Sequence, residues 1–268
     1  MAESPAISIR DLVVSYDGRR VLDGINLEIM RGETMVLLGG SGSGKSTLLR
    51  QVIGLGRPES GQVLVNGVDL AHCKEVDLKR ARRSIGVAFQ NGALFNSISI
   101  EDNIALPLRE HTRLAESTIQ LMTWMKLAVV GLAEFGQHTP PELSGGMRKR
   151  AAVARALALD PEILVFDEPS AGLDPIVGAE LDDLILGLKR AFSMTVLVVT
   201  HEMASAFRIA DRMAMLYQGS LIAVGTKEEI QKSRHPRIRQ FLDRVPDRLA
   251  DTGAIASHFR RYLEGREM

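Results

Sequence analysis

The chain has a single cysteine, Cys73, among 268 residues, so it cannot form an internal disulfide. One cysteine without a supporting motif is more often an incidental residue than a nucleophile, and this usage fits a reducing compartment. Basic and acidic side chains number 33 each, which leaves no global charge bias of the kind found in nucleic-acid-binding proteins. We therefore expect no nucleic-acid partner.

Long apolar runs are also missing. No stretch of about 18 uninterrupted apolar residues occurs, so nothing in the sequence is expected to span a bilayer. The first residues lack the basic start and the apolar core of a signal peptide. With 45% apolar and 25% charged residues, the composition is that of an ordinary globular protein. These features predict a cytosolic chain, unless a partner holds it at a membrane.

Glycine, in contrast, is concentrated in one functional pattern. An apolar run at 35–38 leads into Gly39, four further residues and then Gly-Lys-Ser, with a helix-compatible segment following. This is the phosphate-loop pattern in its required strand-before, helix-after context. Glycines allow backbone N–H groups to face a phosphate, and the helix N-terminus adds its positive dipole end. The stretch predicts a nucleoside triphosphate site formed by Gly39, Gly40, Ser41, Gly42, Ser43, Gly44, Lys45, Ser46 and Thr47.

Two side chains of this loop have specific expected roles. Lys45 is expected to reach the β- and γ-phosphates, and the Ser46 hydroxyl is expected to bind Mg²⁺. The alternative is a glycine-rich turn that binds nothing, which the Lys-Ser pair disfavours.

Strand and helix patterns outline an α/β chain with a mixed sheet. Strand-like residues at 7–16, 21–30 and 61–67, the last closed by an Asn-Gly turn, predict antiparallel strands beside the nucleotide unit. Continuous apolar runs at 163–166, 195–199 and 213–217 predict parallel strands buried on both faces.

The middle of the chain is helical in character. Apolar spacing predicts helices over 100–109, 116–130 and 145–159, the third ended by Asp160-Pro161, and a further helix is expected over 177–192. The apolar cluster in the second helix is predicted to be core packing: Met122, Trp124, Met125 and Leu127. We expect a domain over 1–243, with a helical part at about 91–160, and an extension over 244–268 with a possible helix at 254–263.

A second constellation accompanies the phosphate loop. The run 163–166 ends in Asp167-Glu168, where Asp167 fits the role of holding Mg²⁺ and Glu168 that of polarising water for attack on the γ-phosphate. Alone, such a pair would usually be a solvated strand end. Leu143 to Met147 places Ser-Gly-Gly at a helix start, an arrangement that binds anions but would, taken alone, be a helix cap.

These motifs occur in the order seen in ATP-binding-cassette ATPases, which the chain resembles over about residues 7–240. The resemblance implies a P-loop NTPase fold of that type, with an antiparallel β subdomain and a helical signature subdomain. It implies that Tyr16 stacks on adenine and that Gln90 touches Mg²⁺ and water and senses a transmembrane partner. His201 would hold the γ-phosphate and the water. Glu168 is present, so the site is expected to hydrolyse ATP.

The same resemblance implies sites built from two chains. Ser144 and Gly146, with Gly145 between them, would bind the γ-phosphate of ATP held by the opposite subunit, and Asp174 would lie in a loop between subunits. A chain with one phosphate loop and one signature should then act as a homodimer with two composite sites. Met147 stands where the family usually has glutamine, and we expect it to adjust the site without abolishing it.

Residues 89–95, 102–112 and 235–242 further resemble the Mla-type ATPases of Gram-negative lipid transport. That group implies permease subunits, an MCE-domain protein and a small STAS-domain protein as partners, and a peripheral position on the cytoplasmic face of the inner membrane. For Leu94, Phe95 and Ile98, permease contact and core packing remain equally open. The alternatives are an ATPase subunit for another hydrophobic solute or, with less support, a soluble cassette ATPase acting on DNA or ribosomes. A small-molecule kinase would not explain the signature or His201.

Overall fold

The computed structural model describes residues 4–245. The chain divides into two compact units, Met1–Ile230 and Gln231–Met268, which are described separately. The boundary expected at 243/244 stays a prediction, and the helix expected at 254–263 lies outside the described residues.

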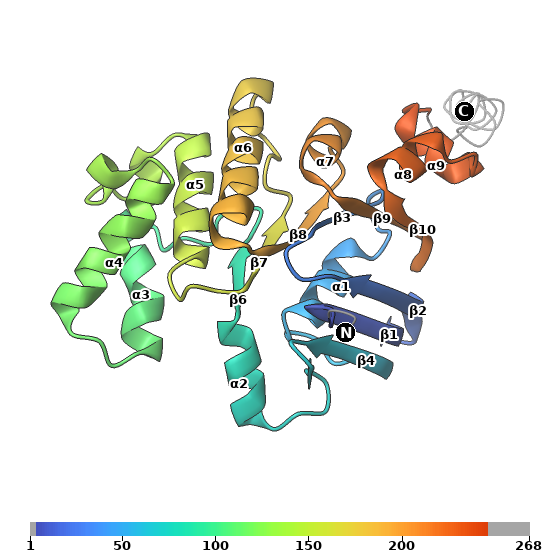
Figure 1. Cartoon of the computed structure of the whole chain (residues 1–268), viewed down its shortest axis with the longest axis horizontal. Coiled ribbons are helices and arrows are strands. Elements are labelled where there is room, and N and C mark those ends of the chain that lie inside the picture. The colour runs from blue at the N-terminus through green and yellow to red at the C-terminus, as the bar shows by residue number, and fades with distance from the viewer. Residues whose placement is uncertain (1–3, 246–268) are drawn as a thin grey trace, which may run out of the picture. The chain divides into compact units, whose positions relative to one another are not determined.

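A six-stranded sheet forms the centre of the first unit (Figure 1). Its order is β10-β9-β3-β8-β7-β6, and all neighbours run parallel except β10, which is antiparallel to β9. Every residue of β3 and β8 is buried, as their unbroken apolar runs predict. The strands are β3 (Thr34–Leu38), β6 (Ile85–Ala88), β7 (Ile163–Asp167), β8 (Thr195–Thr200), β9 (Arg212–Tyr217) and β10 (Ser220–Thr226).

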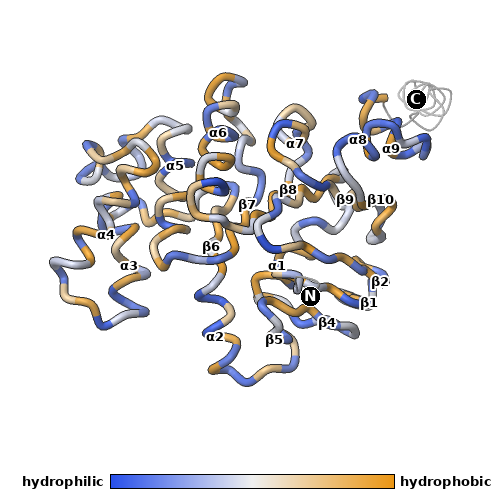
Figure 2. Tube along the Cα trace, viewed as in Figure 1, coloured by the Kyte–Doolittle hydropathy of each residue, from blue (hydrophilic) through white to orange (hydrophobic). Residues whose placement is uncertain are grey.

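A second, antiparallel sheet has the order β2-β1-β4-β5. It consists of β1 (Ile7–Tyr16), β2 (Arg19–Ile29), β4 (Ser60–Val65) and β5 (Val68–Asp69). Asn66 and Gly67 both have positive φ, 49° and 80°, so the turn predicted after β4 closes a two-residue hairpin with β5. Helix α1 (Lys45–Val52) contacts β2 and β4 of this sheet and β8 of the larger one. Hydrophobic stretches run through the strands of both sheets in Figure 2.

Three helices pack together on the other side of the unit from the antiparallel sheet: α3 (Ile100–His111), α4 (Glu116–Val129) and α5 (Gly145–Ala156) (Figure 1). Helix α5 ends three residues before the predicted end at 159, because the chain tightens into a turn at Leu157 and Ala158 before β7. The remaining helices of this unit are α2 (Glu75–Arg83), α6 (Pro175–Phe192), α7 (Met203–Ile209, not predicted) and α8 (Lys227–Lys232), with 3₁₀ turns at Ala133–Phe135 and Pro140–Glu142. Helix α8 extends two residues past the unit boundary.

The core-packing prediction for α4 is wrong for two of its four residues. Trp124 is 55% and Met125 is 52% exposed, whereas Leu127 is buried. The buried positions of α4 are Ile119, Thr123 and Leu127, one every four residues, so a single stripe of the helix faces its neighbours.

The described part of the second unit contains α9 (Pro236–Leu242), with proline at its first position. Among residues 4–245, no helix is both long and apolar enough to cross a membrane.

Candidate nucleotide-binding site

The phosphate loop joins the end of β3 to the start of α1, and its glycines are required by the backbone. Gly39, Gly42 and Gly44 have φ values of 156°, 73° and 109°. A Cβ on Gly39 would lie 2.4 Å from the carbonyl oxygen of Leu216. A Cβ on Gly44 would lie 2.8 Å from the Leu22 side chain. Larger residues at these two positions would therefore displace the neighbouring strands.

The loop offers hydrogen-bond donors to an anion. Lys45 folds back over the loop, where its Nζ donates to the carbonyls of Gly39 (2.8 Å) and Gly40 (3.0 Å). Burial lowers the pKa of Lys45, and the nearby charges of Glu168 and Asp167 oppose that change. The Ser43 hydroxyl is buried without a protein hydrogen-bond partner. A half-buried ammonium, an unpaired hydroxyl and the free N–H groups of a helix start together fit a phosphate group.

Two carboxylates follow at the end of β7. Burial raises the pKa of Asp167, as does the charge of Glu168, while Lys45 and Lys149 lower it. Glu168 has a left-handed backbone with φ 49°, held by a hydrogen bond of 2.8 Å from its N–H to the carbonyl of Val199. A non-glycine residue in this region costs about 1 kcal/mol or more, so the surrounding structure must enforce it. This backbone directs the Glu168 side chain to the end of β8.

The end of β8 holds that carboxylate with three donors. His201 Nδ1 lies 2.9 Å from Glu168 Oε2, Thr200 Oγ1 donates to the same oxygen at 3.2 Å, and the His201 N–H donates to it at 3.4 Å. Because Nδ1 faces a carboxylate, we assign its proton to that nitrogen, which leaves Nε2 of the neutral ring as an acceptor. Glu168 is 13% and His201 59% exposed, so the pair joins a sheltered carboxylate to an accessible imidazole.

The signature residues lie at the start of α5. Ser144 caps the helix, and its Oγ accepts from the N–H of Met147 at 3.3 Å. Gly146 packs so closely on α6 that a Cβ there would lie 2.5 Å from Val177. Helices α5 and α1 lie well apart in Figure 1, with β7 and β8 between them.

The other expected site residues are placed individually. Asp174 caps α6, where its Oδ1 accepts from the N–H groups of Ile176 (3.0 Å) and Val177 (3.1 Å). Tyr16 ends β1 and is 45% exposed, and Gln90 is exposed in the loop after β6. Phe95, in the same loop, is 53% exposed, so core packing does not describe it.

Two cations of α5 hold that loop, and sequence reasoning missed both contacts. Lys149 Nζ donates to the carbonyl of Gln90 (2.6 Å) and to that of Glu168 (3.1 Å). Arg155 donates to the carbonyls of Ala93 (2.6 Å) and Gly92 (2.9 Å). Burial lowers the pKa of Lys149, and the charges of Glu168 and Asp167 oppose this. The acceptors are all main-chain carbonyls, which every residue type carries, so no sequence signal marks them.

Comparison with known proteins gives a consistent assignment. Residues 22–171 match the family described as ABC transporter. Over 241 residues the chain is 39% identical to the intermembrane phospholipid transport system ATP-binding protein MlaF of Escherichia coli, covering 90% of each chain. With MlaF of Haemophilus influenzae it shares 41% over 236 residues, 88% of this chain and 89% of the relative.

Mycobacterial relatives also match. The probable ribonucleotide transport ATP-binding protein mkl of Mycobacterium leprae is 44% identical over 238 residues. The match spans 89% of this chain and 69% of that protein, and 66% of its counterpart in Mycobacterium tuberculosis.

Solved structures agree. A dimeric ATP-binding cassette in a post-hydrolysis state bound to ADP and Pi has a TM-score of 0.76 at 30% identity, covering 82% of this chain and 98% of that one. The cbiO1 protein of Clostridium perfringens, part of the ABC transporter complex cbiONQ, has a TM-score of 0.78 at 30% identity, covering 90% and 100%.

The chain belongs to the ABC transporter family. It is the ATP-hydrolysing, ATP-binding subunit of a transporter, and the fold predicted from the sequence is confirmed. The resemblance to the Mla-type ATPases is confirmed as well.

Proposed function

We propose that this ATPase powers phospholipid transport between an inner and an outer membrane and so maintains lipid asymmetry. The observation that carries the proposal is the match to the MlaF proteins, 39–41% identical across about nine tenths of both chains. A match of that extent includes the loop after β6 as well as the ATP site, so it bears on the transport system and not on ATP chemistry alone.

The working form is a homodimer with two composite sites. One chain would supply the phosphate loop and Tyr16, and its partner would supply the start of α5 with Ser144, Gly145 and Gly146. The separation of α1 and α5 within one chain supports this arrangement, as does the dimeric state of the neighbour with ADP and Pi. Two helix N-termini would then face the same γ-phosphate from opposite sides. ATP would draw the two copies together, and its hydrolysis would let them part.

Within each site, Glu168 would accept a proton from the attacking water. His201 Nε2 would accept a hydrogen bond from that water, with Glu168 fixing the tautomer. When both ring nitrogens carry protons, the Nε2–H would instead donate to the γ-phosphate. Lys45 would leave its two loop carbonyls for the phosphate oxygens, a stronger charge-assisted partner. Asp174 would stabilise the interface loop by capping α6.

The donor set also fits Mg²⁺. Ser46, Gln90 and Asp167 supply a hydroxyl, an amide oxygen and one carboxylate, which matches the preference of Mg²⁺ for few protein oxygens beside substrate phosphates. Bound there, Mg²⁺ would neutralise charge that develops on the phosphates.

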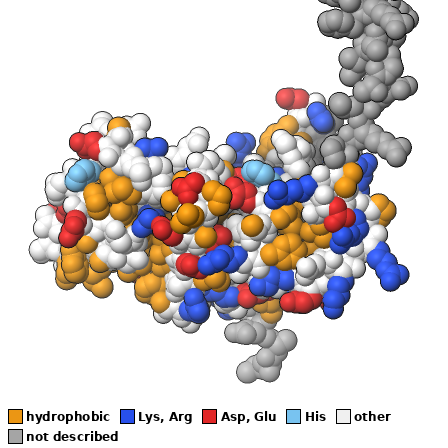
Figure 3. Space-filling model, turned by 90° about the horizontal axis from the view of Figure 1, so that it is seen from above, with side chains coloured by type: hydrophobic (Ala, Val, Ile, Leu, Met, Phe, Trp, Pro, Cys, Tyr) orange, Lys and Arg blue, Asp and Glu red, His pale blue; other side chains and the backbone are white. Residues whose placement is uncertain are grey.

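The proposed partners follow the same system. Permease subunits would contact residues 90–95, and an MCE-domain protein and a small STAS-domain protein would belong to the complex. The permease would hold the ATPase at the cytoplasmic face of the inner membrane. Basic and acidic side chains are interspersed on the face shown in Figure 3, which gives no support there to a nucleic-acid surface.

A ribonucleotide transporter is a second candidate, because the relative named for that function is 44% identical. We place it second because that match spans only 69% of the relative, whereas the MlaF matches span about nine tenths of both chains. An ATPase subunit for another hydrophobic solute is a further alternative.

One experiment separates these candidates. The tagged chain is recovered from detergent-solubilised membranes, and the proteins and small molecules bound to it are identified by mass spectrometry. A multi-span permease with an MCE-domain protein and phospholipid supports the proposal. Recovery of a permease with a ribonucleotide, or with a soluble solute-binding protein, would keep the transport assignment and show that the solute is not phospholipid. Recovery without any permease contradicts the transport assignment and leaves the ATP chemistry in place.

A further inference from the structure

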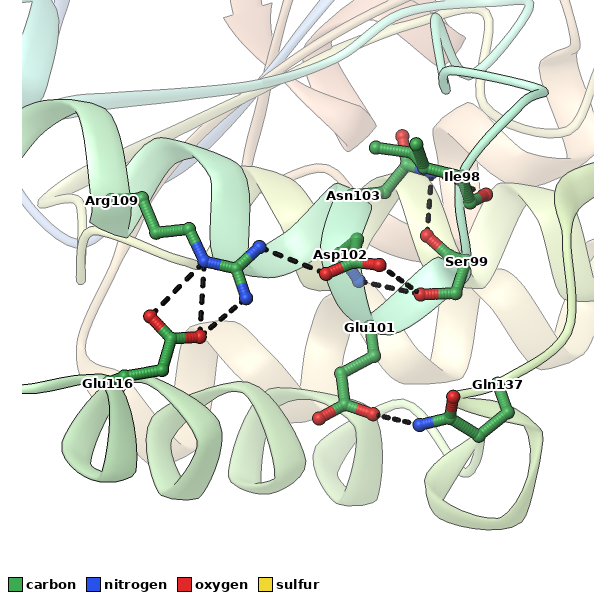
Figure 4. A network of polar contacts seen from close by, with 8 residues as sticks. All are labelled: Ile98, Ser99, Glu101, Asp102, Asn103, Arg109, Glu116 and Gln137. Atoms are coloured by element: carbon green, nitrogen blue, oxygen red, sulfur yellow. Dashed lines mark hydrogen bonds and ion pairs between the residues drawn. The ribbon is translucent and has the colours of Figure 1, made fainter.

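The loop after β6 is fixed to α3 by one buried side chain. Asn103 has no exposed surface, and its Oδ1 accepts from the N–H of Phe95 at 2.7 Å. Its Nδ2 donates to the carbonyls of Phe95 (3.0 Å) and Ser99 (2.9 Å). The amide thus pairs with both backbone groups of Phe95, as a neighbouring strand would. Figure 4 shows Asn103 turned toward Ile98 and Ser99.

The first turn of α3, which carries Asn103, is stabilised by further polar contacts. Ser99 caps α3, with its Oγ accepting from the N–H of Asp102 at 3.0 Å. Asp102 pairs with Arg109 (2.9 Å), and Arg109 pairs with Glu116 of α4 (2.5 Å) (Figure 4). Asn103 therefore holds Phe95 against a frame formed by two helices.

We call the two hydrogen bonds between Asn103 and the backbone of Phe95 the clamp. The residue that the clamp holds carries an exposed aromatic ring. Phe95 is 53% exposed, although its backbone is fully paired by a buried amide. A buried asparagine amide is costly unless its groups are bonded, and here its oxygen and its nitrogen both bond the backbone of Phe95, while the nitrogen also donates to Ser99. Such a fixed apolar projection fits a pocket on a partner protein better than it fits solvent.

The other end of the same loop is joined to the main chain of Glu168. Arg155 holds Gly92 and Ala93, and Lys149 joins Gln90 to the carbonyl of Glu168. Residues 90–99 are thus held by α3 at one end and by α5 at the other.

We propose that Asn103 is a positioning residue that keeps Phe95 in the orientation needed to receive a transmembrane partner. The inference rests on the proposed function for the existence of that partner, and it is independent of the transported solute.

The test measures ATP hydrolysis by the isolated ATPase and by the intact transporter in lipid nanodiscs. Asn103→Leu removes the clamp at similar volume, and Phe95→Ala removes what it positions. Thr123→Val is the matched control, since Thr123 is equally buried in the same helical group but its hydroxyl has no protein partner. We expect the rate of ATP hydrolysis by isolated Asn103→Leu to stay within about twofold of wild type. Its stimulation by the permease should fall about tenfold. Thr123→Val should match wild type in both states.

A double-mutant cycle makes the test specific. If Asn103 acts through Phe95, the double variant is no worse than Phe95→Ala alone. The proposal would be overturned if the losses of the two single variants multiply in the double variant. It would also be overturned if Asn103→Leu loses as much ATP hydrolysis in the isolated ATPase as in the transporter. If Asn103→Leu does not fold, Asn103→Asp is used, because it keeps the acceptor for the Phe95 N–H and loses the donors.

A separate measurement tests the clamp even if the proposed function is wrong. If the wild-type chain recovers no permease, that function fails, whereas amide hydrogen exchange still tests the clamp. The Phe95 amide should then exchange at least about tenfold faster in Asn103→Leu than in Thr123→Val. Unchanged exchange would show that Asn103 does not hold Phe95.

Discussion

Nδ1 of His201 lies 2.9 Å from Oε2 of Glu168, although 33 residues separate them in the chain. The contact depends on two strand ends, β7 and β8, which run parallel and place both residues at the same edge of the sheet. The left-handed backbone of Glu168 turns its side chain across to β8. The carboxylate therefore orients the imidazole, as the roles that we propose for Glu168 and His201 in ATP hydrolysis require.

Replacing the carboxylate tests its proposed role. Glu168→Gln should lower ATP hydrolysis about 100- to 1000-fold, because an amide cannot accept the proton of the attacking water. ATP binding should persist, since Lys45 and the loop are unchanged, and an ATP-bound dimer should accumulate. Phosphate release and light scattering measure the two effects. Glu162→Gln, at an exposed position beside the start of the same strand, is the control. A Glu168→Gln chain that hydrolyses ATP normally would remove Glu168 from the mechanism.

Replacing Lys149 tests whether α5 supports Glu168 at the end of β7. Lys149→Met should lower kcat about tenfold with little change in the KM for ATP, because Glu168 and Gln90 lose a shared donor while the phosphate loop is untouched. Lys79→Met, which removes an exposed cation from α2, should leave both constants unchanged. A rise in KM at constant kcat would instead indicate a role in binding ATP.

Asp182 gives a pH-dependent prediction away from the site. Burial raises the pKa of its carboxyl above 3.8, although the Ser205 hydroxyl donates to it at 2.5 Å. A raised folded-state pKa means that the ionised form costs stability at neutral pH. That cost disappears as the pH falls through the folded-state pKa and is gone below the unfolded value.

Asp182→Asn should therefore raise the Tm at pH 7 by about 2–4 °C, or about 1 kcal/mol for a chain of this size. The gain should shrink as the pH falls toward 4. Thermal unfolding between pH 4 and 8 measures it, with Asp183→Asn as the exposed neighbouring control that breaks only an ion pair with Arg208. A gain that grows on acidification would contradict the sign.

Local patterns were sufficient to predict the nucleotide unit. The strand, loop and helix around Gly39 to Thr47 were predictable because the glycines, the apolar run and the Lys-Ser pair lie next to one another. The parallel strands β7 and β8 were predictable from unbroken apolar runs that only two-sided burial explains.

Packing between residues far apart in the chain was harder to predict from the sequence. Apolar residues occur on more than one face of α4, so spacing alone could not show that Trp124 and Met125 face outward while Thr123 is buried. The basic residues after the signature are visible in the sequence, but three of the carbonyls that Lys149 and Arg155 hold come from a loop more than 50 residues away. Only the folded backbone brings them together.

The central claim, that each ATP site is shared by two copies, is tested most directly by complementation. Chains carrying Lys45→Ala and Ser144→Arg are co-expressed with different tags, and the mixed dimer is isolated through both tags. Each variant alone should be inactive, because both of its sites are damaged. In the mixed dimer both defects fall in one site and the other is intact, so we predict about half of wild-type hydrolysis. A mixed dimer as inactive as either parent, or full activity of Ser144→Arg alone, would contradict the composite site.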